Sequence, residues 1–465
     1  MPTYDFTFPS TAAGFPVSIT ENGVEVATTT VGALVARYTP ITVEVDLPEG
    51  IYVGEATDPV YFSRDRAPGV LNVLASVAED ADDLTSEIGA ALSASLAPLS
   101  RVATLPTAAA SVAKVYDGAR NTYNLRASHL LKIRAALGKA IGGTGLASIA
   151  ALGTSIAAGQ GALAGSTSYP VRLRQLFEAV GVPIAGTGNV LCHHGDTTAD
   201  ARWGFVGTWT KFNPGPTSRT VLYSSATTSA TATFTADLPG TVVEVRYSNS
   251  SGPFTVAIDG GSAVTVTPAG GTAIATYTVS GLADTTHTVV ATRTSGTLYL
   301  VGANVRKATG LQIHNVGLGG ARANDLYLTQ PYDARSLVRD VLIPDLCLVN
   351  VMTNEAYTEV SAATFKTNMT SMLTSLVNGG IPLVLIAEIP AGGTTTPTGN
   401  AMNLTAFRTA LYELAITFDV PVIDLYERWG GTYAGANGVG MMFDTFHPNA
   451  AGYGDYASAI IQSIR

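Results

Sequence analysis

Residues 146–161 read LASIAALGTSIAAGQG, an apolar run that ends in a serine within a glycine-rich loop. The run is short and carries no charged residue, which is typical of a strand buried on both faces of a sheet. Ser155 opens the loop, and Gly159 and Gly161 follow it. Open α/β sheets build their sites at the carboxyl ends of their strands. The segment therefore predicts a parallel sheet with Ser155 at its functional edge.

The rest of the C-terminal part of the chain repeats this pattern. Helical segments, ATFKTNMTSMLTSLVNGG (363–380), AMNLTAFRTALYELAITF (401–418) and a last helix after residue 448, alternate with three further apolar runs. Those runs are DLCLVNV (345–351), IPLVLIAEI (381–389) and VPVIDLY (420–426). Apolar strands that alternate with helices predict a parallel sheet covered by helices on both faces.

Residues 211–308 interrupt this order with an almost purely β pattern. Apolar and polar residues alternate, for example at Val243, Val245 and Tyr247, and turn residues recur at short intervals. This pattern is typical of a β-sandwich. We therefore expect an α/β domain made of residues 145–210 and 309–465, with an independent β-sandwich inserted at 211–308.

The N-terminal part has a different organisation. Residues 1–66 alternate like strands, and Asn22-Gly23 predicts a hairpin, so we expect a small β attachment domain. Apolar residues from Val70 to Ala91 then follow a heptad spacing within a helix expected over 67–100. We favour a short parallel coiled coil between identical chains; the alternative is an amphipathic helix packed on its own domain. Residues 101–144 are expected to form a linker with one helix.

Composition excludes several classes of function. The chain has 465 residues, a net charge of −9 and no basic run, which argues against nucleic acid as its partner. Its two cysteines are too few for a disulfide framework. No apolar run is long enough to span a membrane. The N-terminus lacks the basic start and apolar stretch of a signal peptide, so export by that route is not expected.

A second motif supplies a base for Ser155. Residues 443–461 read FDTFHPNAAGYGDYASAII, in which Asp444 precedes His447 by three residues. A nucleophilic hydrolase needs a histidine base and a carboxylate that orients it. It also needs donors for the developing oxyanion. The glycine-rich loop NVGLGGARANDL (315–326) and Asn354 each follow a predicted strand and offer such donors.

These motifs together resemble the SGNH hydrolases, the GDSL-type esterase family. That family carries Ser, Gly, Asn and Asp-x-x-His in four successive blocks, which correspond here to GTSIA, GLGGA, MTNEA and DTFHPN. The resemblance implies a three-layer α/β/α fold and a site without metal or cofactor. It also implies a residue for each role: Ser155 as nucleophile, His447 as base, Asp444 as its partner, and an oxyanion hole of the Ser155 and Gly320 N–H groups and the Asn354 amide.

The chain departs from the family pattern at two places. Thr154 stands where the family usually has Asp, which removes a carboxylate from the serine loop. The family usually has the motif Gly-x-Asn-Asp, and here Met352 stands at the position of the Gly and Glu355 at the position of the Asp. Since Met352 replaces a residue without a side chain, we expect it to narrow the pocket.

Further residues allow two interpretations each. Trp203 and Trp429 fall near the expected mouth of the site, where they would either stack on a sugar or pack the inserted domain; we assign them to substrate binding. Trp209 allows the same two interpretations. The CHHGD stretch (192–196), with its adjacent His193 and His194, fits no common zinc spacing, so we expect a loop near the site. His287 is expected at a strand edge.

The sequence thus predicts a serine esterase acting on an ester of a carbohydrate polymer, most simply an O-acetyl group. The β domain, coiled coil and inserted sandwich resemble phage tail-associated hydrolases. That resemblance implies a homotrimer attached to other tail proteins in the virion, acting on the polysaccharide of the host envelope. The alternatives are a lectin-like tail protein with a degenerate hydrolase site, an esterase of lipids or glycolipids, and a purely structural tail protein.

Overall fold

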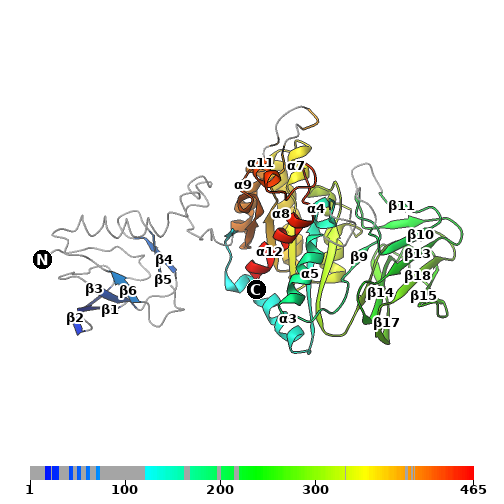
Figure 1. Ribbon diagram of the computed structural model, residues 1–465, viewed down its shortest axis with the longest axis horizontal. Coiled ribbons are helices and arrows are strands. Elements are labelled where there is room, and N and C mark those ends of the chain that lie inside the picture. The colour runs from blue at the N-terminus through cyan, green and yellow to red at the C-terminus, as the bar shows by residue number, and fades with distance from the viewer. Residues whose placement is uncertain are drawn as a thin grey trace. The chain divides into compact units, whose positions relative to one another are not determined.

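The computed structural model describes residues 121–464, except 162–167, 196–199, 214–218, 330, 393–395, 399–401 and 403. Before residue 121 it describes the backbone of six strands. The chain divides into two units, Met1–Val115 and Tyr116–Arg465 (Figure 1). Across the described residues, no helix has the length and apolar character needed to cross a membrane.

The described strands of the N-terminal unit are all antiparallel. Four form a sheet in the order β2-β1-β3-β6, and the other two form the hairpin β4-β5. In the β1-β2 pair Glu21 lies opposite Val24, whereas Asn22 and Gly23, where the sequence predicted the hairpin turn, lie outside the described residues. The strands are β1 (Pro16–Glu21), β2 (Val24–Thr30), β3 (Ile41–Val45), β4 (Gly50–Val53), β5 (Pro59–Phe62) and β6 (Val70–Val73).

Strand β6 corrects the start of the predicted coiled coil. Val70–Val73 pairs with β3 as the fourth strand of the sheet, although the heptad pattern placed these residues in a helix over 67–100. A short segment with two β-branched residues suits a strand as well as a helix, and pairing with β3 decides between them. Residues 74–100, which carry the rest of the heptad pattern, lie outside the described residues.

The second unit is built on a parallel sheet, as predicted. Strands β20, β8, β21, β22 and β23 lie side by side in that order and all run parallel. The short β7 pairs antiparallel with β23 at one edge. The strands are β7 (Thr122–Tyr123), β8 (Leu146–Gly153), β20 (Gly310–Gly317), β21 (Leu346–Asn350), β22 (Leu383–Ala387) and β23 (Val422–Asp424).

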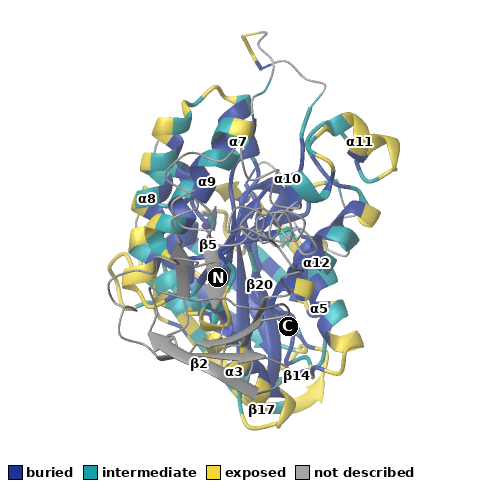
Figure 2. Cartoon of the chain, turned by 90° about the vertical axis from the view of Figure 1, so that its left-hand side faces the viewer, coloured by how far each residue is buried: buried dark blue, intermediate teal, exposed yellow. Residues whose placement is uncertain are grey.

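Helices cover both faces of this sheet. Figure 2 shows α8 and α9 on one side of the buried strands and α5 and α12 on the other. The α-helices are α3 (Leu131–Ile141), α4 (Ser155–Ala158), α5 (Tyr169–Ala179), α6 (Ala334–Ser336), α7 (Thr353–Tyr357), α8 (Ala362–Asn378), α9 (Leu404–Phe418), α10 (Leu425–Arg428), α11 (Tyr433–Gly438) and α12 (Ala450–Ile464). The described residues also contain two 3₁₀-helices and one π-helix, namely η3 (Ala127–Leu130), η4 (Asn324–Leu326) and η5 (Leu337–Leu342).

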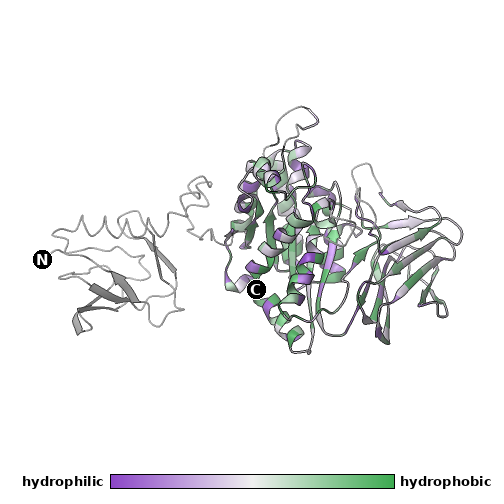
Figure 3. Cartoon of the chain, viewed as in Figure 1, coloured by the Kyte–Doolittle hydropathy of each residue, from purple (hydrophilic) through white to green (hydrophobic). Residues whose placement is uncertain are grey.

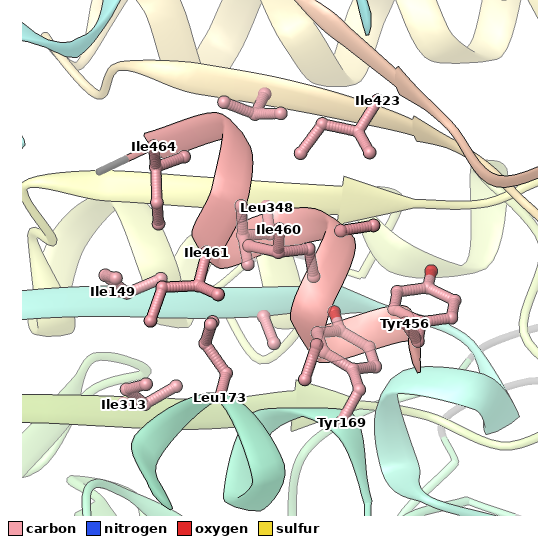
Figure 4. Packing of buried hydrophobic residues seen from close by; sticks show 14 of the residues in the cluster. Ile149, Tyr169, Leu173, Ile313, Leu348, Ile423, Tyr456, Ile460, Ile461 and Ile464 are labelled. Carbon is pink, nitrogen blue, oxygen red and sulfur yellow. The ribbon is translucent and has the colours of Figure 1, made fainter. Parts of the chain in front are cut away.

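The last helix holds the C-terminal end of the chain against the sheet. Ile460 of α12 is fully buried in a cluster that includes Ile149 of β8 and Leu348 of β21 (Figure 4). The rings of Tyr456 and Tyr169 stack with their centroids 4.5 Å apart, which joins α12 to α5. Burial of each such side chain contributes about 1.5–3 kcal/mol, so α12 is firmly docked.

The segment expected to be a linker belongs in part to this unit. Leu130, Ile133 and Ala140, from the predicted helix ASHLLKIRAALGKAI, are buried in the same cluster. Strand β7 adds to the edge of the sheet. The α/β domain therefore begins before the predicted start at residue 145, because the apolar face of α3 packs against the sheet.

The predicted sandwich is present; burial alternates along β15, whereas β14 is buried on both faces. Phe254 and Val256 of β15 and Val243 and Val245 of β14 are buried in a second core. Figure 3 shows hydrophobic and hydrophilic residues along these strands. One sheet has the order β10-β13-β18-β15-β16, with strands β10 (Trp203–Val206), β13 (Thr231–Thr235), β15 (Phe254–Ile258), β16 (Val264–Val266) and β18 (Thr288–Arg293).

The second sheet of the sandwich is continuous with the parallel sheet, contrary to the expected independent domain. Gly302 and Ala303 of β19 pair with β9, and β9 pairs in turn with Asn315 of β20. The strands of the sandwich also begin earlier than residue 211, with β9 and β10. Its remaining strands are β9 (Val190–Leu191), β11 (Thr210–Lys211), β12 (Tyr223–Ser225), β14 (Gly240–Ser248), β17 (Ile274–Thr285) and β19 (Leu298–Arg306). Sequence patterns report which face of a strand is buried, but they do not report which strand pairs with it.

A buried ionic cluster lies where the two parts of this sheet meet. The Glu244 carboxylate accepts hydrogen bonds from Arg246 at 2.8 Å, from Arg306 at 2.9 Å and from Asn304 at 3.0 Å. Asn304 also donates to Gln312 of β20 at 3.1 Å, which extends the cluster into the parallel sheet. Burial alone would raise the pKa of Glu244, but the two arginines outweigh it and lower the pKa to about 2.

We expect Glu244→Ala to lower the free energy of unfolding by about 3–5 kcal/mol, because it leaves Arg246 buried without its counter-charge. Urea denaturation measures this change. Asp284→Ala is the matched control, since it breaks the exposed ion pair of Asp284 with Lys307 and is expected to cost less than about 1 kcal/mol. Equal costs for the two variants would show that the junction does not depend on the cluster.

Candidate active site

Ser155 is placed by the end of strand β8. The strand ends at Gly153, and Ser155 is the first residue of the short helix α4. A side chain at Gly153 would collide with Asn350, because its Cβ would lie 2.2 Å from Asn350 Oδ1. Glycine therefore allows β8 and β21 to come together directly beneath the serine loop.

His447 lies within hydrogen-bond distance of Ser155. The His447 Nε2 atom is 2.9 Å from Ser155 Oγ, and both residues are at least nine-tenths buried. His447 Nδ1 is 2.9 Å from Asp444 Oδ2. A carboxylate accepts hydrogen bonds, so Nδ1 carries the ring proton and Nε2 is left to accept a proton from Ser155.

The spacing of Asp444 and His447 is explained by a local turn. Asp444 Oδ1 accepts the backbone N–H groups of Phe446 at 2.7 Å and of His447 at 2.8 Å. Burial favours a higher pKa for Asp444, but these bonds and the His447 ring outweigh it and lower the pKa. The carboxylate therefore stays ionised and holds the imidazole in one tautomer and one orientation.

The proposed oxyanion donors sit on three adjacent strand ends. Ser155 follows β8, Gly320 follows β20 and Asn354 lies in α7 after β21, and the sheet order is β20-β8-β21. Within the described structure, the N–H groups of Ser155 and Gly320 donate to no protein acceptor. The Asn354 amide donates one proton to Ala321 O at 2.8 Å and has a second to offer.

A buried carboxylate, Glu388, links two of these loops. It follows β22 and is fully buried. Its Oε1 accepts from the Thr154 hydroxyl at 3.2 Å and from the Asn350 amide at 2.9 Å. Its Oε2 accepts from the Thr353 N–H at 2.7 Å. Glu388 thus places a carboxylate beside Thr154, where the sequence lacks the usual Asp, and no sequence signal singled it out.

The two other departures from the family pattern are also buried. Met352 is fully buried, so its side chain lies in the protein interior. Glu355 accepts the Ala323 N–H and thereby ties α7 to the Gly320 loop. Burial is the main cause that raises the pKa of Glu355, and the negative charge of the nearby Glu388 carboxylate raises it further. The pKa of Glu355 is thereby raised to about 8.

Trp203 and Trp429, assigned to substrate binding from the sequence, lie in hydrophobic cores. Trp203 is 9% exposed in the sandwich core, and its indole N–H donates to Val190 O at 3.4 Å. Trp429 is 6% exposed in the hydrolase core, and its N–H donates to Asp455 at 2.8 Å. Neither ring has enough free surface to stack on a sugar, so the structure corrects this assignment in favour of packing. Trp209 is buried in the sandwich core as well.

The CHHGD stretch lies beside the Gly320 loop, as expected. Gly195 forms an isolated bridge with Gly319, and the Gly319 N–H donates to His194 O at 2.7 Å. The His193 and His194 rings contact the backbone carbonyls of Leu222 and Gly317. Among the described residues, no three His, Cys, Asp or Glu side chains are grouped to hold a metal ion.

His287 lies just before strand β18, near the strand edge where the sequence placed it. Its ring contacts Asp259 Oδ2 at 2.7 Å, and the other ring nitrogen contacts two backbone carbonyls. These contacts give it a structural role in the sandwich.

Two features at the mouth of the site were missed from the sequence. Phe446 packs edge-on against Tyr357, with ring centroids 5.2 Å apart, so an aromatic ring from a loop and one from the end of α7 meet beside His447. Arg219, from the β-rich segment, reaches the Gly319 carbonyl at 2.9 Å. Both depend on contacts between distant parts of the chain, which spacing in one sequence does not reveal.

We expect the pH dependence of stability to report the protonation of Glu355. Between its usual pKa of 4.5 and its raised value of about 8, the native state holds a proton that the unfolded chain releases. The free energy of unfolding therefore falls as pH rises through this window, by at most about 1.4 kcal/mol per pH unit. Glu355→Gln removes this dependence, so its stability relative to wild type should increase between pH 5 and 8.

Urea unfolding at pH 5, 6.5 and 8 tests this expectation. Glu178→Gln is the matched control, because it removes an exposed carboxylate from α5 and should leave the slope unchanged. An unaltered slope in Glu355→Gln would mean that Glu355 is ionised in the native state.

Comparison with known proteins agrees with this geometry. Residues 280–454 match the model of the GDSL-like Lipase/Acylhydrolase family. The match contains Gly320, Asn354, Asp444 and His447. Ser155 precedes the matched residues in sequence, but the fold brings it within hydrogen-bond distance of His447. A search of curated proteins found no match.

Several solved structures are similar. A peptidoglycan O-acetylesterase is 16% identical with a TM-score of 0.58, and the match covers 73% of this chain and 97% of the other. An acetyl xylan esterase is 20% identical with a TM-score of 0.27, covering 33% of this chain and 81% of the other. A family two carbohydrate esterase from Cellvibrio japonicus is 12% identical with a TM-score of 0.25, covering 57% and 96%.

At these identities the first structure shows a shared fold, and the TM-scores of the other two are too low to carry an argument. Residues 280–454 thus carry a GDSL-like lipase/acylhydrolase domain within a fold shared with an esterase, and the chain is a carboxylic ester hydrolase.

Proposed function

We propose that this chain is a serine esterase that removes O-acetyl groups from a polysaccharide of the bacterial envelope. The observation that carries the proposal is the hydrogen-bonded series from Ser155 through His447 to Asp444. A degenerate site in a lectin-like protein would have no reason to keep all three side chains in this arrangement. The fold shared with a peptidoglycan O-acetylesterase supports the choice of an acetylated polymer over a lipid.

The geometry assigns each residue a step. His447 Nε2 takes the Ser155 proton as Oγ attacks the ester carbonyl, and Asp444 stabilises the resulting imidazolium. The N–H groups of Ser155 and Gly320 and the free amide proton of Asn354 stabilise the oxyanion. His447 returns the proton to the leaving sugar hydroxyl, which leaves an acetyl-enzyme. Water, deprotonated by His447, then releases acetate and restores Ser155.

We expect the protein to hydrolyse p-nitrophenyl acetate and to release acetate from O-acetylated envelope polysaccharide or peptidoglycan. A panel of esters from acetate to long acyl chains measures the preference, and a clear optimum at long chains would favour a lipid esterase instead. Ser155→Ala should lower kcat by about 10⁴-fold or more, because it removes the nucleophile. Asn354→Ala should lower it by about 10²–10³-fold.

Ser371→Ala is the control for the serine variant, since it makes the same change at an exposed position of α8 and should retain full activity. Unchanged turnover in a pure Ser155→Ala preparation would remove the serine mechanism. Activity on activated esters without acetate release from any polymer would support the esterase activity but contradict the proposed polysaccharide substrate.

We further propose that the chain acts as a homotrimer in a phage tail, at the host surface. The support is the sequence resemblance to tail-associated hydrolases together with the heptad pattern, most of which falls at residues 74–91. Since β7 and α3 belong to the hydrolase unit, a truncated chain should begin at Tyr116.

We expect light scattering to show a trimer for the full chain and a monomer for residues 116–465. The active-site residues all lie in the second unit, so the two forms should have equal activity per chain on a small ester. A monomeric full chain would contradict the coiled coil, and a folded but inactive truncation would mean that chains share a site.

A further inference from the structure

The peptide group between Gly319 and Gly320 has two roles at once. Its N–H belongs to Gly320, the proposed oxyanion donor, and its carbonyl belongs to Gly319. In a trans peptide these two groups point in opposite directions within one plane. Any contact that fixes the Gly319 carbonyl therefore also sets the direction of the Gly320 N–H.

This peptide needs such a contact, because it lies between two glycines. Gly320 has a φ of +69°, a region that glycine adopts without cost. Residues without side chains also place little restriction on rotation of the peptide plane between them. A rotated plane would turn the Gly319 carbonyl oxygen toward the oxyanion position and would oppose the reaction.

Arg219 supplies the contact from the β-rich segment. Its Nη1 donates to the Gly319 carbonyl oxygen at 2.9 Å. A hydrogen bond from a charged guanidinium is stronger than one between neutral groups. The positive charge also polarises the peptide, which makes the N–H on the opposite side a better donor.

The surroundings of Arg219 keep its guanidinium in place. Its Nε lies 3.9 Å from Asp325 Oδ2, and the Asp325 side chain is only 3% exposed. The next residue, Thr220, is fully buried, and the Val221 N–H donates to Tyr332 O at 2.9 Å. Both the backbone next to Arg219 and its head group are therefore held by residues of the 309–465 segment, Tyr332 and Asp325.

The rest of the loop is held by separate contacts. The Gly319 N–H donates to His194 O at 2.7 Å, and the Ala321 N–H donates to Leu318 O at 3.2 Å. These bonds fix the peptides on either side of the 319–320 peptide. They do not fix the carbonyl that lies opposite the Gly320 N–H.

We propose that Arg219 is a positioning residue for the oxyanion hole, through which the β-rich segment takes part in the esterase reaction. The inference rests on the proposed function, in which the Gly320 N–H binds the oxyanion. It assigns the sandwich a role in catalysis on small esters as well as on polymers. The continuous sheet that joins the two parts provides the rigid support that such a contact requires.

Arg219→Ala tests the proposal in the full-length protein with p-nitrophenyl acetate. We expect kcat to fall by about 10- to 100-fold, less than the loss of a whole oxyanion donor, with KM changed by less than about threefold. Arg219→Lys should recover part of kcat, since an ammonium can also donate to the carbonyl. Guanidinium ion added to Arg219→Ala should raise kcat, whereas it should not do so in wild type.

A boronic acid inhibitor separates positioning from general structure. Its tetrahedral adduct on Ser155 carries a negatively charged oxygen, so Arg219→Ala should weaken its affinity by a factor similar to the loss in kcat/KM. The melting temperature should stay close to that of wild type. Arg322→Ala is the matched control, because Arg322 also pairs with Asp325. It should keep kcat within about twofold.

Each outcome decides a different point. If Ser155→Ala is inactive while Arg219→Ala keeps its kcat within twofold, the esterase stands and this inference is overturned. If Arg322→Ala loses as much kcat as Arg219→Ala, the ion pair with Asp325 matters and the peptide contact does not. If Ser155→Ala retains activity, the proposed function itself fails.

Discussion

The parallel pairing of β20, β8 and β21 is the constraint on which the site depends. Because the three strands end at one edge, the loops that follow them carry Ser155, Gly320 and Asn354 to neighbouring positions. The pairing is close: a Cβ at Gly153 would meet Asn350, and one at Gly317 would meet the backbone of α4 at Ala158 N, 2.2 Å away. Larger residues at either position would separate the strands and with them the catalytic groups.

Two buried carboxylates then connect the loops to one another. Glu388 joins the serine loop to the start of α7, and Glu355 joins α7 to the Gly320 loop. Neither carboxylate has a cation among its hydrogen-bond donors in the described structure; their donors are N–H groups and a hydroxyl. The position of Glu388 explains why residue 154 is Thr and not the usual Asp. A second carboxylate at residue 154 would lie close to the Glu388 carboxylate and repel it.

The β-rich segment is part of the same structural unit as the hydrolase domain. Its sheet continues through β19 and β9 into β20, and the Glu244 cluster fills the junction with charges that satisfy one another. A buried network of this kind specifies one arrangement, since any slip would leave a charge without its partner. The segment is thereby held rigidly enough for Arg219 to reach a single carbonyl in the active-site loop.

The sequence by itself determined the class of fold and the chemical groups of the site. Apolar runs alternating with helices predicted the parallel sheet, and local spacing predicted that Asp444 and His447 act together, because their contact is made within one turn. The tertiary structure decided everything that depends on distant pairing. It placed Val70–Val73 in a sheet, Trp203 and Trp429 in cores, and Glu388 and Arg219 beside the site. Burial periodicity records only that a side chain is covered, whereas the identity of the covering residue is fixed when strands far apart in sequence pair.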